Sequence, residues 1–237
     1  MAADYRRGMD DQTTIFIDNE HVTAEATDRI TVINPATEET IGSVPDCGPA
    51  DIDRAVLGVG GGPYHLLLTR SKDFDPFFTI FETMYPDPAE VGLWLGLIQT
   101  IWDEGEGAGY AGALTRDPLP GTNPKVVLQQ VGIGDNQVTT LGAEFLARGH
   151  GAVMLTEPAR EAYGIDVVGD STIGSALIEY EYGVPEPFTN TPPSDPDPHE
   201  WVRRERTGQD QIAHFFATGE ILKFCDGPCG DPTRGAE

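Results

Sequence analysis

Alternating apolar and polar residues near the N-terminus predict short β-strands. Apolar side chains recur between polar ones through residues 12–44, which is the pattern of strands that bury one face. Asp18-Asn19 and Asn34-Pro35 are typical turn sequences between such strands. We therefore expect a small β-ribbon, with strands centred on residues 15–17, 30–33 and 41–44.

Two incompatible signals meet just after this ribbon. Residues 49–51 (Pro-Ala-Asp) are typical of a helix start, and the helix would continue through Val56. The apolar run 55–59, closed by three glycines and a proline, is instead typical of a buried strand that enters a turn. Such a local conflict argues against one continuous domain. We therefore divide the chain into residues 1–53 and 54–237.

Residues 73–116 favour helices, because their apolar residues fall near helical spacing. Stripes of this kind usually form core or the underside of a lid rather than a cofactor site. The stripes contain Phe74, Phe77, Phe78, Phe81, Val91, Leu93, Leu95, Leu97, Ile98, Ile101 and Trp102.

The remainder of the chain alternates strand and helix patterns, and this alternation predicts an α/β fold. The predicted elements are a buried strand over 125–131, a turn over 132–136, an amphipathic helix over 138–148, an alternating strand over 175–182, a Pro/Asp-rich loop over 183–199 and a last helix over 209–222.

The strongly acidic composition excludes some partners. The chain has 15 basic and 39 acidic residues, a formal net charge of -24. A surface this acidic repels phosphate backbones and anionic lipid, so we expect no nucleic-acid or membrane partner. No run approaches the roughly 18–20 apolar residues of a membrane span, and residues 1–11 lack the apolar segment of a secretory signal. We expect a cytoplasmic location for the sequence as written.

The cysteines favour a disulfide or free thiols over a metal site. Cys225 and Cys229 flank a Gly-Pro turn, and their spacing permits either a tight disulfide or two thiolate ligands. A structural zinc needs about two more ligands, and His214 is the only histidine nearby. We therefore expect no metal. Cys47 stands alone and is interpreted as structural.

Residues 15–56 resemble the N-terminus of aldehyde dehydrogenases. The resemblance rests on IFIDNE from residue 15, VINPATEETIGSVP from residue 32 and DIDRAV from residue 51. It implies a β-ribbon and first helix that lead to an NAD domain. The catalytic residues of that family do not follow this segment. A dinucleotide-binding turn is also missing, because after Gly58-Val59-Gly60 the chain has Pro63 where such a turn needs its third glycine. No cofactor is therefore expected.

Residues 54–237 resemble the C-terminal half of a bacterial α/β-hydrolase-like family that is often exported. The resemblance rests on RAVLGVGGGPYHLLLTRS, DFDPFF, RDPLPGT, VLQQVGIGDNQV, DPHEWVRR and FCDGPC. It implies an incomplete α/β-hydrolase-like sheet with a helical lid over about 63–124. It also places the acid of a catalytic triad after the strand at 126–131, and a histidine before the last helix.

Asp135 and His199 are the two residues that match these positions. Asp135 follows a buried strand at a glycine turn, where an acid can hold and stabilise an imidazole; the alternative is a cap for the next helix. His199 follows Asp135 in the order found in α/β-hydrolases. The alternatives for His199 are a solvated loop histidine, or a cation site with Asp195 and Asp197.

The nucleophile is the missing part. None of the serines lies in a G-x-S-x-G turn. Gly169-Asp170-Ser171 is similar to a block of another esterase class, but the spacing before His199 does not fit that class. We interpret Ser171 as a turn residue and His214 as a partly buried helix residue. Without a nucleophile, Asp135 and His199 have nothing to activate.

The predicted function is that of a hydrolase-related fragment or pseudoenzyme, which keeps the acid and histidine side of an ester or peptide hydrolase site. If the chain is active, we expect a serine-type α/β-hydrolase. One alternative is an NAD-dependent aldehyde dehydrogenase-like fragment. Another is a non-catalytic interaction module, because an incomplete sheet exposes an edge that favours a homo-oligomer or a complementing strand.

Overall fold

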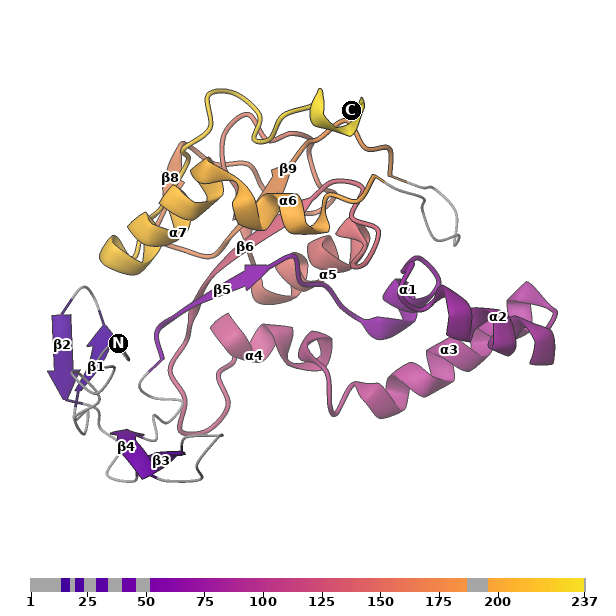
Figure 1. The fold of residues 1–237 in the computed structure, drawn as a ribbon, viewed down its shortest axis with the longest axis horizontal. Helices are drawn as coiled ribbons and strands as arrows, with labels where there is room; N and C mark the ends of the chain where they lie inside the picture. Colours follow the sequence, from indigo (N-terminus) through magenta and orange to yellow (C-terminus); the bar gives the residue numbers. More distant parts are fainter. Residues whose placement is uncertain are drawn as a thin grey trace, which may run out of the picture.

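The computed structural model describes residues 14–17, 20–23, 29–33, 40–45, 52–186 and 196–236. Over these residues the chain is a mixed α/β protein with a four-stranded parallel sheet and helices α1 to α7 (Figure 1). The predicted α/β class is confirmed at this level. Among the residues that the structure describes, no helix has the length and apolar character needed to cross a bilayer.

The central sheet has the order β5-β6-β9-β7, and every pairing in it is parallel. Its strands are β5 (Arg54–Gly58), β6 (Val126–Gly132), β9 (Ala176–Tyr180) and β7 (Val153–Met154). The prediction of an alternating strand at 175–182 was wrong in pattern, because all five residues of β9 are buried. Parallel strands covered on both faces are mostly apolar, and the one charged residue of β9, Glu179, is paired with Arg160.

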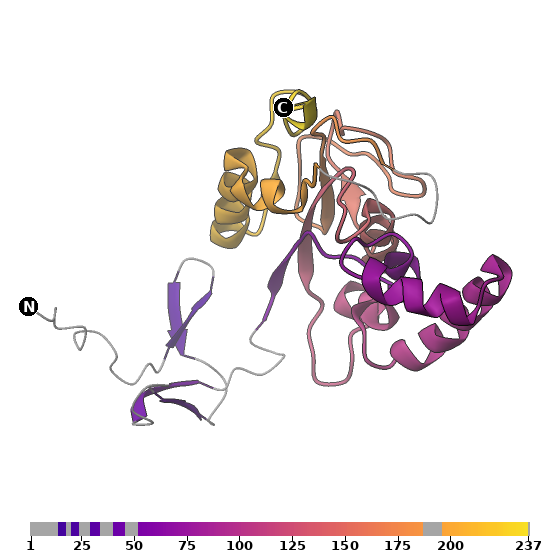
Figure 2. The same ribbon diagram turned by 45° about the vertical axis from the view of Figure 1, so that its right-hand side comes forward.

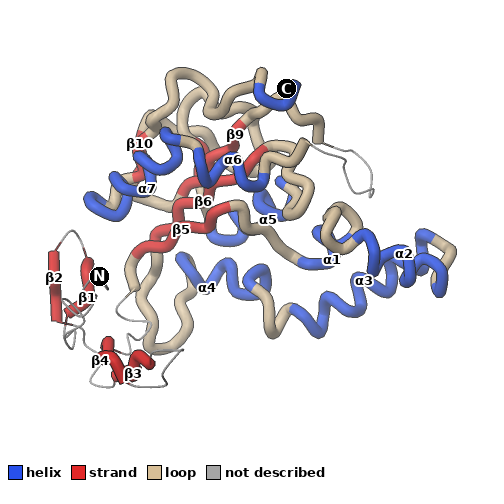
Figure 3. The backbone as a smooth tube through the Cα atoms, viewed as in Figure 1, coloured by secondary structure: helices blue, strands red, loops and turns tan. Residues whose placement is uncertain are grey.

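Helices cover both faces of this sheet, as the tube in Figure 3 shows. Helix α5 (Thr140–His150) lies on one face, while α6 (His199–Arg204) and α7 (Arg206–Thr218) lie on the other. Two successive glutamines of β6 join the layers, because neighbouring strand residues point to opposite faces. Gln129 Nε2 donates to Ala143 O in α5 at 3.0 Å, and Gln130 Nε2 donates to Gly208 O in α7 at 3.1 Å.

The predicted helical region lies to one side of the sheet, and its last helix packs against α5 (Figures 1 and 2). The prediction that its apolar stripes are buried holds only for Phe78, Val91 and Leu95, which pack together. Of the other eight stripe residues, four are half-buried and four are exposed, up to 75% for Ile101. The elements are α1 (Tyr64–Leu68), α2 (Asp75–Met84), α3 (Pro88–Trp102), the 3-10 helix η2 (Gly107–Tyr110) and α4 (Ala111–Thr115).

The N-terminal strands form two antiparallel hairpins outside the central sheet. They pair β1 (Thr14–Ile17) with β2 (Glu20–Thr23), and β3 (Arg29–Ile33) with β4 (Thr40–Pro45). The three predicted strands are confirmed, and β2 is an addition. Four predicted features lie outside the described residues. They are the turns at Asp18-Asn19 and Asn34-Pro35, the lone Cys47 and the helix start at 49–51.

The conflict near residue 55 is resolved in favour of the strand. Ala55 and Val56 lie in β5, where they pair with Val127 and Leu128 of β6. The continuation of a helix through Val56 is therefore wrong, because the parallel pairing with β6 supplies the hydrogen bonds of this segment. After the strand, Val59 adopts a positive φ of 53° and is buried in the core.

The C-terminal region differs from prediction at the end of its helix. Helix α7 ends at Thr218, because Gly219 takes the left-handed conformation that commonly terminates helices. The strand β10 (Ile221–Leu222) then pairs with β8 (Ser171–Thr172). Cys225 and Cys229 form a disulfide, as one of the open alternatives predicted. A last 3-10 turn, η3, spans Arg234–Ala236.

Candidate functional site

Asp135 lies just beyond β6, at the carboxyl edge of the parallel sheet, and its side chain has two roles. Its Oδ1 accepts hydrogen bonds from the backbone N–H groups of Gln137, at 2.9 Å, and Val138, at 2.8 Å. Its Oδ2 lies 2.8 Å from Nδ1 of His199. The contact with the histidine is the predicted partnership. The alternative of a helix cap was wrong, because α5 begins only at Thr140 and Asp135 bonds the turn that precedes it.

His199 is the first residue of α6 and is buried, so the predicted alternative of a solvated loop histidine is wrong. The Asp135 side chain is fully shielded from solvent, whereas that of His199 keeps 10% of its exposure. Since a carboxylate oxygen accepts, Nδ1 carries the proton and Nε2 is left as the basic nitrogen of a neutral ring. The hydrogen bond that His199 donates to Asp135 raises the pKa of His199, and burial opposes this effect only in part.

Asp197 fixes the backbone on both sides of this pair. Its Oδ1 accepts from the backbone N–H of His199 at 3.1 Å and of Asn136 at 3.2 Å. Its Oδ2 accepts from Gln137 Nε2 and lies 2.7 Å from Lys72 Nζ. Burial acts to raise the pKa of Asp197, but the hydrogen bonds from Lys72 and its neighbours outweigh it and lower the pKa. No pattern in the sequence indicated that Lys72 belongs to this site. Lys72 stands out only because lysine is rare in the chain.

The predicted alternative of a cation site receives no support from these contacts. Asp197 uses both oxygens for protein donors, and Asp195 lies outside the described residues. Within the part of the chain that the structure describes, no group of three or more His, Cys, Asp or Glu side chains could hold a metal ion. Asp197 is therefore a positioning residue for the segment that leads into α6 at His199.

No serine in the described ranges is hydrogen-bonded to His199. Ser171 lies on β8 rather than in the predicted turn, because it pairs with Leu222 of β10. Its hydroxyl bonds to Glu220, which also bonds His214 Nε2 at 3.2 Å. Ser175 Oγ accepts from the backbone N–H of Val127 at 3.0 Å. The other described serines are Ser43, which bonds Arg29, and Ser71, which accepts from Asp73 N; Ser194 is outside the described residues.

A partly buried ion cluster surrounds Arg160, and no pattern in the sequence indicated it. Arg160 Nε lies 2.9 Å from Glu179 Oε2 on β9, Nη2 lies 2.7 Å from Glu144 Oε1 on α5, and Nη1 bonds Glu186. Burial raises the pKa of Glu179 to about 7, although Arg160 opposes the shift. Burial also acts on Arg160, but the carboxylates outweigh it and raise its pKa. Three acids sharing one cation make this cluster pH-sensitive.

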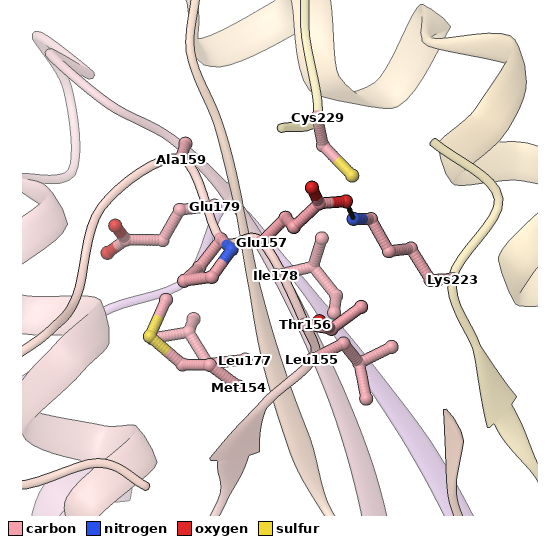
Figure 4. A pocket seen from close by; sticks show the side chains of 11 residues that line it. Met154, Leu155, Thr156, Glu157, Ala159, Leu177, Ile178, Glu179, Lys223 and Cys229 are labelled. Atoms are coloured by element: carbon pink, nitrogen blue, oxygen red, sulfur yellow. Dashed lines mark hydrogen bonds and ion pairs between the residues drawn. The ribbon is translucent and has the colours of Figure 1, made fainter. Parts of the chain in front are cut away.

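A small cavity beside β9 is not a ligand site. Figure 4 shows Glu157 and Lys223 pointing toward one another next to Cys229, with Nζ and Oε2 3.3 Å apart. The cavity has a volume of about 20 Å³, which suffices for a single water molecule. It is lined by Met154, Leu155, Thr156, Glu157, Pro158, Ala159, Leu177, Ile178, Glu179, Lys223 and Cys229.

Comparisons with family models, curated proteins and solved structures gave no match. The resemblances to α/β-hydrolases and to aldehyde dehydrogenases therefore stay predictions. For the second, much of the resembling segment lies outside the described residues. Strand β5 leads through a cis Gly62-Pro63 peptide bond into α1, a helix of five residues, rather than into the long helix of a dinucleotide-binding unit.

Proposed function

We propose that the chain carries the acid and histidine half of an α/β-hydrolase-type esterase or peptidase site. The observation that supports this most is the 2.8 Å contact between Asp135 Oδ2 and His199 Nδ1 at the carboxyl edge of a parallel sheet. Ligand sites of open α/β sheets lie at this edge. The order of Asp before His also fits α/β-hydrolases.

The chemistry follows from the tautomer. Nε2 of His199 would accept the proton of an attacking hydroxyl, and Asp135 would stabilise the imidazolium that forms. Later the imidazolium would return the proton to the leaving group. The described residues offer no hydroxyl to Nε2, so the nucleophile would come from a second segment. On its own the chain would then behave as a pseudoenzyme.

An activated ester and a serine probe test this proposal on the same samples. We expect slow cleavage of p-nitrophenyl acetate through direct attack of His199 Nε2 on the acyl carbon, with loss of nitrophenolate and hydrolysis of the acyl-imidazole. His199→Ala should lower this rate. His214→Ala, a change in a matched histidine that bonds Glu220, should not. A fluorophosphonate probe should leave the chain unlabelled.

Two outcomes would count against the proposal. An ester cleavage rate that is unchanged by His199→Ala would remove the histidine from any hydrolytic role. Fluorophosphonate labelling that disappears in His199→Ala would show a working Ser–His pair within the chain, and would overturn the requirement for a second segment.

The open edge of the sheet favours a second candidate function, that of an interaction module. Within the described ranges β5 pairs only with β6, so its other side is an edge. A strand edge is a template for pairing with another chain. We propose that this edge accepts a strand from a second copy or a partner. Light scattering at increasing concentration should then show dimers, and a monomer throughout would exclude the second copy.

A further inference from the structure

A cavity of about 650 Å³ lies between α1, α2 and α3, away from Asp135 and His199. We name it the α1–α3 cavity; these helices are the group beside the sheet in Figure 1. Its volume is typical of small-molecule sites, which combine apolar walls with a few polar groups. It is lined by His65, Leu66, Thr69, Arg70, Phe78, Glu82, Tyr85, Pro86, Pro88, Val91, Gly92 and Leu95.

The positive group in this cavity is Arg70, which is only partly exposed. Its Nη1 donates to Leu66 O at 3.0 Å and lies 3.4 Å from Thr69 Oγ1. No carboxylate of the described residues forms an ion pair with it. Glu82 also lines the cavity but is exposed. Burial lowers the pKa of Arg70, and the charge of Glu186 opposes this only in part.

The second polar group is His65, whose tautomer is set by a chain of hydrogen bonds. Gln99 Nε2 lies 2.6 Å from Glu106 Oε1 and 2.7 Å from Asp103 Oδ1. Two carboxylates require the amide nitrogen at that position, so Gln99 turns its oxygen toward His65. That oxygen lies 3.2 Å from His65 Nδ1, which must therefore carry the proton.

This tautomer leaves Nε2 of His65 as a hydrogen-bond acceptor. With Nδ1 as the donor to Gln99, Nε2 of the neutral ring has a free lone pair. His65 lines the α1–α3 cavity and also a second cavity that Gln99 and Asp103 line, so it lies between the two. The same Glu106 carboxylate accepts from the backbone N–H of Tyr64 at 3.1 Å, which anchors the start of α1. The acceptor is thus held by buried groups on α3 and the segment after it.

We propose that the α1–α3 cavity binds an apolar carboxylic acid that also carries a hydrogen-bond donor, such as an N-acylated aromatic amino acid. Its carboxylate would meet the Arg70 guanidinium, and its N–H would meet His65 Nε2. Its apolar body would lie against Phe78, Val91 and Leu95. This proposal does not rest on the hydrolytic role proposed for Asp135 and His199.

Isothermal titration calorimetry with three small probes tests each contact. N-acetylphenylalanine has both groups, its primary amide lacks the charge, and 3-phenylpropanoate lacks the N–H. We expect N-acetylphenylalanine to bind about tenfold more tightly than its amide, since a charge-assisted hydrogen bond is lost. Arg70→Gln should abolish this preference. Arg116→Gln, at an exposed arginine that also bonds a backbone carbonyl, should retain it.

His65→Phe tests the acceptor. It should bring the affinity for N-acetylphenylalanine close to that for 3-phenylpropanoate, while the affinity for 3-phenylpropanoate itself stays unchanged. Leu95→Trp should fill the cavity and prevent binding of all three probes, and Leu97→Trp, on the exposed side of α3, should not. Three results would each overturn the proposal. The acid and the amide could bind equally, the preference for the acid could survive Arg70→Gln, or the folded wild type could bind none of the probes.

Discussion

Lys72 Nζ lies 2.7 Å from Oδ2 of Asp197, and this ion pair joins the helical region to the segment that leads into α6 at His199. The same carboxylate caps the backbone of His199 and Asn136. Two distant parts of the chain therefore meet at one partly buried side chain. The position of the candidate histidine depends on this junction as well as on Asp135.

Removal of the Asp197 carboxylate should destabilise the fold. Asp197→Ala leaves several donors without their acceptor, so we expect a loss of about 1–3 kcal/mol in the free energy of unfolding. Urea denaturation measures it. Asp210→Ala provides the control, because its ion pair with Arg206 lies on the exposed face of α7 and such pairs contribute little. Equal losses in the two variants would contradict the role given to Asp197.

Asp135→Asn should lower the pKa of His199 without unfolding the protein. The asparagine oxygen can still accept from Gln137 and Val138, while the charge that favours the imidazolium is lost. The folded-state pKa of His199 lies above its ordinary value of 6.5. The stability that His199 contributes in the wild type is therefore fully present below pH 6.5, and this contribution is lost as pH rises through the folded pKa. NMR titration of the imidazole C–H signals, with His214 as internal reference, measures the shift.

Glu179 should make stability fall as pH rises. Its pKa is about 7 in the folded state against an ordinary value of 4.5. The folded state therefore binds more protons between pH 4.5 and 7, and stability decreases across that window. Glu179→Gln should reduce the difference in the free energy of unfolding between pH 5 and pH 8 by roughly 1–3 kcal/mol. Thermal melts of both proteins at pH 5 and pH 8 would show it, and parallel pH profiles would exclude Glu179 as the cause.

At Val59, replacement by glycine should destabilise the protein no more than replacement by alanine. At a strand residue, glycine should be the more destabilising of the two. Val59 is buried, and its φ of 53° is strained for a β-branched side chain. Val59→Ala should cost about 1–3 kcal/mol, and Val59→Gly should cost no more, because glycine relieves about 1 kcal/mol of strain. At Val127, inside β6, glycine should be worse than alanine. Denaturant midpoints of the four variants decide between these expectations.

The elements that the sequence predicted well are those with a strong local pattern. The apolar run of β6 and the helical spacing in α2 and α3 depend on neighbouring residues alone. The alternating pattern assigned to β9 was wrong, because burial of both faces depends on helices from other parts of the chain. The same reason explains why Leu93 and Ile101 are exposed although their spacing is that of a buried stripe.

The candidate site was predictable only where chain order carries information. Asp135 follows a buried strand and His199 begins α6, just before the last long helix, and the structure brings the two together. Lys72 and Arg160 gave no such signal, because an ion pair between distant residues leaves no periodicity in the sequence. Their roles appear only once the fold has placed their partners.

The two glutamines of β6 have a consequence for how the molecule comes apart. Gln129 connects the strand to α5 and Gln130 connects it to α7, each through a buried amide. Loss of either helix layer would leave a buried amide beside the sheet without its hydrogen-bond partner. The free-energy cost of that unpaired group disfavours partial opening. The sheet and its two layers should therefore exchange their amide hydrogens as one cooperative unit, while the outlying α2 and α3 open independently.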